Sequence, residues 1–582
     1  MLQGITPGVK YIMRLVDTIE EKENGVIKGD LEHLKKLFIM PDSPDKFLEF
    51  GYELLDLIHS FFKEKGGIHI EITLPELAKI FSDIDIPNNP HLLKDILSEI
   101  KNKIIAHSVK VGNPYYIGHM TSAIPYFMIL IEMIIAALNQ NQVKIETAKA
   151  STFLEREFIS WIHRLIFQRS PRFYKSNVQN HRVALGNVTL DGTIANLTAM
   201  LVARNRAFPP DGRFPGIRKA GIVDAYRHYN CQKAVILVSQ RGHYSIDKIA
   251  RLTGIGEHNV IKIPVDSHNR IDIRKLRNVC NHIKEINEKN SEKIKIISLI
   301  GIAGTTETGN IDNLVELRKV ADEYDTYFHV DAAWGGSVLL VDRYRYLFKG
   351  IENADSVTFD AHKLLYSPLS MGMILFRNPN HLKYISHTSN YIIRPDSVDQ
   401  GRFTVEGSRP FSCLKPWVTL KIFGATGFDL LFTHSFSLTD TMQELLENHE
   451  NFELLNDPEL FIINYRFVPG KIKARLQKLK ANFEDAEPKK SIRILNKIKK
   501  ANELLNEMNI ELHRAIRQED NSFVSRTMLE STPYSPQKIV VLRAITINPL
   551  TTSEILQEIL EEQDRLGERI YHSDFKSRLE KI

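Results

Sequence analysis

The sequence has few cysteines and no long hydrophobic run. Its 582 residues include three cysteines, Cys231, Cys280 and Cys413, and their odd number and wide spacing argue against a disulfide framework and a zinc cluster. We therefore expect a reducing compartment, the cytoplasm, and no metal site. The most apolar stretch, residues 123–138, contains a proline and a glutamate and is too short to favour a membrane span. The first 22 residues are mixed and charged, unlike a secretion signal.

Neither sign of charge dominates. The 76 basic and 71 acidic residues give a formal net charge of +5, and no aromatic-basic motif indicates a nucleic-acid partner. Internal repeats, low-complexity tracts, and Walker or dinucleotide fingerprints are also missing. With 43% hydrophobic and 25% charged residues, the composition is that of a soluble globular protein that buries a large core.

We expect three parts along the chain. Residues 1–110 are polar, with apolar positions three and four apart, which predicts a helical N-terminal arm. Residues 111–410 form a predicted large domain, in which the turn-rich segment 379–408 is expected to be a loop over a site. Residues 411–582 are predicted to form a small α+β domain.

Strands and helices alternate after residue 182. The predicted strands are 182–185, 234–239, 295–300, 326–330, 356–359 and 372–376. Predicted helices over 193–206 and 313–324 lie between some of them. This alternation predicts right-handed crossovers and a mostly parallel sheet, that is, an α/β fold.

An acid and a lysine follow two of these strands. Asp331 ends the first of them, and Lys363 comes shortly after the second. Ligands of open α/β sheets bind beyond the carboxyl ends of strands. A lysine that forms a Schiff base and an acid that pairs with a pyridine nitrogen suit pyridoxal phosphate. Taken singly, such an acid is more often a turn or cap residue, and such a lysine a surface charge.

Three further candidates lie at strand ends. Gly192 and Thr193 begin a helix, whose N–H groups and dipole suit a phosphate, although many helices begin this way for capping alone. His243 follows the strand 234–239 and could stack on a planar ring or serve only the structure. Thr305 lies in a loop of small residues that permits close approach of a ligand.

In this order, these residues resemble the group II pyridoxal phosphate-dependent amino-acid decarboxylases, and most of all the bacterial subfamily of aspartate 1-decarboxylases or glutamate decarboxylases. Further stretches that carry the resemblance are 118–122, 143–147, 238–245, 405–409 and 540–543. It spans roughly residues 110 to 575. The resemblance implies fold type I, a seven-stranded, mostly parallel sheet with helices on both faces, and a homodimer with shared active sites.

The resemblance implies roles for residues around the cofactor ring. Lys363 would carry the Schiff base, and Asp331 would pair with the pyridine nitrogen. Ala333 would lie against one ring face and His243 against the other, with Thr305 near the ring.

It also implies a phosphate site formed by Gly192, Thr193 and His362. The family usually has Thr-Ser-Gly-Gly-Thr before this helix, whereas here Leu190 and Asp191 replace the serine and the first glycine. A carboxylate beside a phosphate dianion weakens binding unless it points away or pairs with a base.

The implied reaction is α-decarboxylation of L-aspartate to β-alanine or of L-glutamate to GABA. Tyr391 would reprotonate a quinonoid intermediate, Arg543 would bind the substrate carboxylate, and His119 would lie near the substrate side chain. Lys144 lies in a neighbouring loop, and both side chains, being polar or basic, suit an acidic substrate. Both His119 and Lys144 could instead serve a subunit interface. Other open readings are another pyridoxal phosphate-dependent lyase or aminotransferase, and a non-catalytic regulatory protein of the same fold.

Overall fold

The computed structural model divides the chain into two compact units, residues 1–110 and 111–582. The residues it describes are 35, 37–64, 67–68, 72–88, 90–389, 393–394, 396–484 and 487–582. The described part of the first unit is helical. Its α-helices are α3 (Phe47–Lys63), α4 (Leu74–Ile80) and α5 (Leu93–Glu99). Helix α4 begins with a capping box, in which the Thr73 side chain accepts from the Glu76 N–H and the Glu76 carboxylate accepts from the Thr73 N–H.

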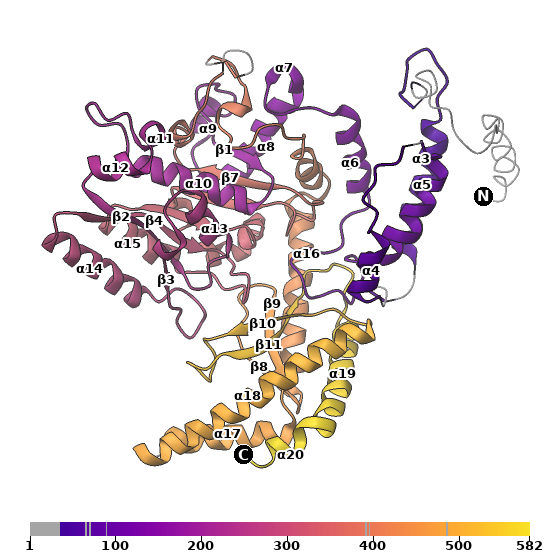
Figure 1. Ribbon diagram of the computed structural model, residues 1–582, viewed down its shortest axis with the longest axis vertical. Coiled ribbons are helices and arrows are strands. Elements are labelled where there is room, and N and C mark those ends of the chain that lie inside the picture. Colours follow the sequence, from indigo (N-terminus) through magenta and orange to yellow (C-terminus); the bar gives the residue numbers. More distant parts are fainter. Residues whose placement is uncertain are drawn as a thin grey trace, which may run out of the picture. The chain divides into compact units, whose positions relative to one another are not determined.

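The second unit contains a seven-stranded sheet in the order β1-β7-β6-β5-β4-β2-β3 (Figure 1). The strands are β1 (Gly186–Thr189), β2 (Cys231–Ser239), β3 (Val260–Ile263), β4 (Lys293–Ile302), β5 (Tyr327–Asp331), β6 (Ser356–Asp360) and β7 (Gly372–Phe376). All neighbours pair in parallel except β7, which is antiparallel to β1 and β6. The predicted mostly parallel α/β sheet is confirmed.

Two details of the predicted strands are wrong. The strand predicted at 182–185 begins at Gly186. Before it, the Arg156 side chain donates to the carbonyl oxygens of Asn180 and Val183 at 2.7 and 3.2 Å, which holds this backbone outside the sheet up to Val183. The edge strand β3 was not predicted. It has four residues, of which two are only half-buried, so it carries little hydrophobic signal.

Helices cover both faces of this sheet. They are α6 (Phe127–Leu138), α7 (Ile145–Ala148), α8 (Ala150–Phe167), α9 (Pro171–Asn177), α10 (Gly192–Ala207), α11 (Ile217–Ala220), α12 (Ile222–His228), α13 (Ser245–Leu252), α14 (Ile273–Lys289) and α15 (Leu314–Glu323). Successive strand residues point to opposite faces, so Phe328 and Val330 join the cluster formed with α8, α14 and α15. The neighbouring Tyr327 joins the cluster formed with α10 and α13.

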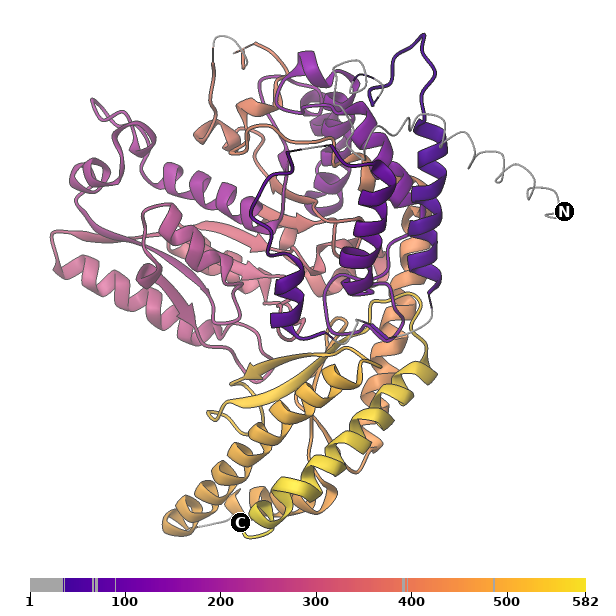
Figure 2. The same cartoon turned by 45° about the vertical axis from the view of Figure 1, so that its right-hand side comes forward.

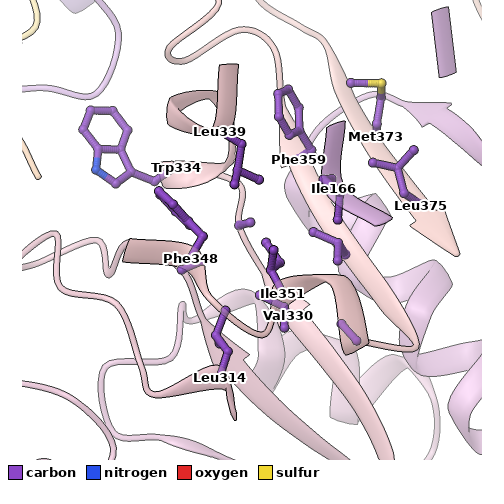
Figure 3. Close-up of a cluster of buried hydrophobic side chains, with 14 of the residues drawn as sticks. Ile166, Leu314, Val330, Trp334, Leu339, Phe348, Ile351, Phe359, Met373 and Leu375 are labelled. Atoms are coloured by element: carbon purple, nitrogen blue, oxygen red, sulfur yellow. The ribbon is translucent and has the colours of Figure 1, made fainter. Parts of the chain in front are cut away.

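Figure 3 shows the first of these clusters, where Val330 of β5 and Phe359 of β6 lie near Ile166 of α8 and Leu314 of α15. Each of these four side chains is almost inaccessible to solvent. Burial of one such side chain stabilises the fold by roughly 1.5–3 kcal/mol. The cluster therefore fixes β5 and β6, the two strands whose ends carry the site.

A four-stranded antiparallel sheet, in the order β10-β11-β9-β8, follows in the chain. Its strands are β8 (Phe452–Leu454), β9 (Ile462–Phe467), β10 (Ser525–Leu529) and β11 (Ile539–Ile545). The helices of this region are α16 (Leu414–Asn448), α17 (Gly470–Glu484), α18 (Pro488–Glu519), α19 (Ser553–Ile570) and α20 (Lys576–Leu579). Figure 2 shows α18 beside this sheet. The described helices include none long and apolar enough to cross a membrane.

Candidate active site

The carboxyl ends of β5 and β6 bring an acid and a lysine to one edge of the large sheet. The two strands are parallel neighbours, with Asp331 opposite Thr358. Three residues after β6 ends at Asp360, the Lys363 Nζ atom lies 3.0 Å from Asp360 Oδ2. The Lys363 side chain is 21% exposed, so its amine is reachable from solvent although its partner is buried.

Both oxygens of Asp331 accept hydrogen bonds from N–H groups. Asn196 Nδ2 on α10 donates to Oδ2 at 2.9 Å, and the Ala333 N–H donates to Oδ1 at 3.1 Å. The side chain is buried. Each carboxylate oxygen has two lone pairs, so Asp331 can accept a further N–H beside the two that it already receives.

His243 lies in the turn between β2 and α13. Its Nδ1 atom is 2.8 Å from Ser245 Oγ and also accepts from the Ser245 N–H. Burial lowers the pKa of His243, while the charge of Asp331 opposes this effect and the charge of Lys363 adds to it. Asp331 and Lys363 are therefore close enough to His243 for their charges to act on it, and burial favours the neutral form of the flat imidazole.

The N-terminus of α10 has the features of an anion site. Asp191 caps the helix, because its Oδ1 atom accepts from the Ile194 N–H at 2.9 Å. Within the described residues, no hydrogen bond uses the N–H groups of Gly192 and Thr193. A Cβ atom at Gly192 would lie 2.9 Å from Asp360 Oδ2, so this close approach requires glycine.

The remaining predicted cofactor residues lie around the same edge. The His362 Nδ1 atom lies 2.9 Å from the Met371 carbonyl oxygen, and its Nε2 atom is 3.8 Å from Asp360 Oδ2. Ala333 is close to α10, since its Cβ atom is 3.4 Å from where a Cβ of Gly192 would stand.

Thr305 is buried in the loop after β4, with its hydroxyl 2.8 Å from that of Thr308. The small sheet holds this loop. Asn464 Nδ2 donates to the Glu307 carbonyl oxygen at 3.0 Å, and Asn456 Nδ2 donates to that of Thr308 at 3.3 Å.

Arg543 comes from β11 of the small sheet. Its Nη1 atom donates to Ser525 Oγ at 2.9 Å and to the Gly118 carbonyl oxygen at 3.4 Å, while its buried Nε atom has no partner among the described residues. Burial lowers the pKa of Arg543 to about 10, and the nearby carboxylate of Glu307 opposes that shift. Because this pKa is still well above 7, the guanidinium is charged at neutral pH.

Charged residues from the regions of both sheets act on His119. Burial lowers its pKa, and the positive charges of Arg543 and then Lys363 lower it further. Arg543 and Lys363 are thus close enough to His119 for their charges to act on its imidazole. The other basic candidate, Lys144, forms an ion pair with Glu146.

Tyr391 lies outside the described residues. The preceding loop is described to residue 389, and Ser389 forms a bridge with Ile393. The predicted loop over 379–408 also contains two short 3-10 helices, His381–Tyr384 and Gln400–Arg402.

Two residues of the site were not predicted from the sequence. Asp360 is the last residue of β6 and pairs with Lys363. Asn196 lies one turn after Thr193 on α10 and binds Asp331. An acid at a strand end beside a candidate lysine, and an amide one turn after a candidate phosphate residue, are the signals that could have found them.

These groups fit pyridoxal phosphate. A lysine amine and a carboxylate stand at neighbouring strand ends, and a neutral imidazole lies close to both. The unpartnered N–H groups of Gly192 and Thr193 suit a phosphate. The donor set therefore matches the aldehyde, the pyridine nitrogen and the phosphate of that cofactor.

Comparisons with known proteins agree with this geometry. Residues 75–468 match the pyridoxal-dependent decarboxylase conserved domain. Over 549 residues the chain is 39% identical to the aspartate 1-decarboxylase of Aliivibrio fischeri, which covers 94% of this chain and 96% of that protein. It is 24% identical over 543 residues to the aromatic-L-amino-acid decarboxylase of Bacillus atrophaeus, covering 91% of this chain and 97% of that protein.

A solved structure shows the same fold. The crystal structure of mouse CSAD in apo form has a TM-score of 0.73 and 23% sequence identity, and the match covers 89% of this chain and 99% of that chain.

Proposed function

The chain belongs to the pyridoxal-dependent decarboxylases, amino-acid carboxy-lyases that use pyridoxal phosphate, and from this membership we propose that its substrate is an acidic L-amino acid. The reaction would convert L-aspartate to β-alanine and carbon dioxide, or L-glutamate to GABA and carbon dioxide. The observation that carries the proposal is the position of Arg543, a buried cation whose Nε donor has no partner in the described part of the chain and whose charge acts on His119 together with that of Lys363. The likeness to the Aliivibrio fischeri aspartate 1-decarboxylase supports aspartate.

Residues of the large sheet would hold the cofactor. Pyridoxal phosphate supplies an electron sink for the electron pair that the departing carboxylate leaves behind. Lys363 would bind its aldehyde, and the Asp331 carboxylate would hold a proton on the pyridine nitrogen. His243 and Ala333 would cover the two ring faces, and Thr305 would lie near the ring.

The phosphate would be held at the start of α10. The N–H groups of Gly192 and Thr193 are available there, and His362 would contribute its Nε2 atom. Because Asp191 is engaged as the helix cap, its carboxylate is directed at the Ile194 N–H and leaves the first two amides for the phosphate.

Residues from both sheets would handle the substrate. Arg543 would orient a carboxylate by charge-assisted hydrogen bonds, which are stronger than neutral ones. His119 would lie beside the substrate side chain. Tyr391 would return a proton to the substrate carbon after carbon dioxide leaves, and a positioned proton donor typically contributes roughly 10²- to 10⁴-fold in rate.

A homodimer with shared active sites is part of this proposal. Helix α6 leaves the apolar side chains of Leu130, Ile134 and Leu138 exposed on the chain. Contiguous exposed apolar side chains are typical of interaction surfaces, so this helix is where we expect a second copy to bind.

A panel of L-amino acids tests the proposed substrate. The purified protein, supplied with pyridoxal phosphate, is incubated with each amino acid, and amine product and carbon dioxide are measured. L-Asparagine and L-glutamine are the matched controls, because they keep the shape of the acids without the side-chain charge. We expect turnover of aspartate or glutamate at least about 100-fold above its amide. Preferential turnover of an aromatic amino acid would contradict the proposal.

A further inference from the structure

A chain of buried hydrogen bonds ends on Asp331. Ser356 Oγ is 2.8 Å from His329 Nδ1, and His329 Nε2 is 2.9 Å from Asn196 Oδ1. Asn196 Nδ2 then donates to Asp331 Oδ2 at 2.9 Å. Thr358 adds a second donor to Asn196 Oδ1, at 2.6 Å. All five residues are buried, so the chain is shielded from solvent.

The fold brings these residues together by strand register. His329 lies opposite Ser356, and Asp331 lies opposite Thr358, on the parallel neighbours β5 and β6. Residues two apart in a strand point to the same face, which here is the face covered by α10. Asn196 projects from that helix onto three of these strand side chains, those of His329, Thr358 and Asp331.

The hydrogen bonds run in one direction. The Asn196 carbonyl oxygen accepts from the Thr358 hydroxyl, and its amide nitrogen must then face Asp331. The reverse orientation would set an amide oxygen against a carboxylate oxygen, which is repulsive. With Asn196 Oδ1 as an acceptor, His329 carries its proton on Nε2 and its Nδ1 atom accepts from the Ser356 hydroxyl.

His329 is neutral under this arrangement. Burial lowers the pKa of His329 to about 4, and the negative charge of Asp331 opposes that shift only in part. A neutral imidazole with a fixed tautomer donates one hydrogen bond and accepts one. The imidazole therefore transmits orientation along the chain and adds no net charge beside Asp331.

We propose that Asn196 and His329 are positioning residues that aim the Asp331 carboxylate at the pyridine nitrogen of pyridoxal phosphate. The inference rests on the cofactor assignment given above. Each Asp331 oxygen accepts one protein N–H, and the donor from Asn196 fixes the rotation of the carboxylate. The lone pairs that remain then face a defined direction, which strengthens a charge-assisted bond to the protonated ring nitrogen.

A merely structural role predicts something different. If this chain of hydrogen bonds only held α10 against β5 and β6, its loss would weaken folding and would weaken the binding of any ring that fills the site. The binding difference between a ring with a nitrogen and the same ring without one would not change. That difference is therefore the quantity to measure.

The experiment compares two cofactors on the full chain. Apoprotein is titrated with pyridoxal phosphate and with its 1-deaza analogue, in which a C–H group replaces the ring nitrogen, and the two dissociation constants are compared. The wild-type protein should prefer pyridoxal phosphate by roughly ten- to a hundredfold, the range for a hydrogen bond between charged groups. Asn196→Leu should reduce this preference to about threefold or less.

Asn205→Leu is the matched control. Asn205 is a buried asparagine on the same helix, but its amide donates to the Tyr384 carbonyl oxygen and takes no part in the chain of hydrogen bonds that ends on Asp331. This variant should keep the wild-type preference. Ser356→Ala is a milder change at the far end of the chain. It frees the tautomer of His329 and should lower the preference roughly two- to tenfold, so it keeps the test decisive if Asn196→Leu does not fold.

A wild-type preference in Asn196→Leu, or in Ser356→Ala where only that variant folds, would overturn the proposed positioning role. Failure of the wild-type protein to bind either compound would contradict the cofactor assignment itself. The two failures are therefore distinguishable.

Discussion

At the scale of single residues, Lys363 and Asp360 form the pair on which the site depends. Their charged atoms are 3.0 Å apart, and Asp360 is buried while Lys363 is partly exposed. Asp360 also lies against the start of α10, where a phosphate would bind, and its Oδ1 atom is buried without a partner among the described residues. One carboxylate thus stands beside both the amine and the anion site.

Replacing the lysine tests the covalent attachment. Lys363→Ala removes the only group in the proposed mechanism that binds the cofactor aldehyde, so the visible absorbance of bound pyridoxal phosphate and the turnover should both be lost. Lys383→Ala, at an exposed position after β7, is the control and should keep both. A visible band that persists in Lys363→Ala would show that another residue binds the aldehyde.

Replacing the buried acid tests its effect on the phosphate. Asp360→Asn removes a negative charge from the anion site and keeps the size of the side chain. Because two anions repel at short range, apoprotein of this variant should bind pyridoxal phosphate roughly three- to tenfold more tightly by fluorescence titration. Weaker binding would mean that the ion pair with Lys363 matters more than the repulsion.

At the scale of elements, the N-terminus of α10 explains an unusual feature of the sequence. The acid at position 191 looked unfavourable beside a phosphate, but the structure uses it as the helix cap. The preceding Leu190 is held by its N–H, which donates to Glu406 Oε1 at 3.1 Å. The two residues that depart from the family pattern, Leu190 and Asp191, are thus both held by local hydrogen bonds.

Two substitutions separate the cap from its charge. Asp191→Ala loses the acceptor for the Ile194 N–H and should lower the free energy of unfolding by about 1 kcal/mol. Asp191→Asn keeps an acceptor and should stay within a few tenths of a kcal/mol of the wild type. Urea unfolding followed by far-UV circular dichroism measures both. Equal stability of the two variants would mean that the cap contributes nothing.

Local patterns in the sequence predicted most of the elements that carry the site. The strands ending at Asp331 and Asp360 are short apolar runs bounded by turn residues, and the structure confirms them. The register that places Asn196 on Asp331 could not be predicted, because it depends on how α10 packs across two strands far away in sequence. The start of β1 was missed for a similar reason, since a side chain from α8 holds the residues before it.

At the scale of the whole 111–582 unit, two sheets meet at the site. Lys363 follows β6 of the large sheet, and Arg543 lies on β11 of the small sheet. Glu459, between β8 and β9, accepts from the Ile311 N–H at 2.8 Å and also pairs with Arg270. Such cross-links fix the distance between the amine and the guanidinium, and no local sequence pattern could have revealed them.

The stability of the fold should depend on pH through buried histidines. Burial lowers the pKa of His163 to about 4, where its Nε2 atom is 3.0 Å from the Phe376 carbonyl oxygen and its Nδ1 atom is 2.9 Å from the Tyr174 hydroxyl. The unfolded chain takes up a proton near pH 6.5, before the folded one does. The free energy of unfolding therefore falls as the pH drops from about 6.5 toward 4, by about 2 kcal/mol between pH 7 and pH 5 for this residue.

His163→Gln provides the check. Glutamine can keep one donor and one acceptor without titrating, so the loss of stability between pH 7 and pH 5 should be smaller than in the wild type by about 2 kcal/mol. Urea unfolding at the two pH values measures it. An unchanged pH dependence would show that His163 is not protonated on unfolding in this range.

The central claim is that the chain removes the α-carboxyl group of an acidic L-amino acid. The most direct measurement uses L-aspartate and L-glutamate labelled with carbon-13 in either the α-carboxyl or the side-chain carboxyl group, with pyridoxal phosphate and the full chain. We predict labelled carbon dioxide from the α-carboxyl label of at least one substrate, with β-alanine or GABA formed in equal amount. Carbon dioxide that carries the side-chain label, or none from either substrate, would contradict the account.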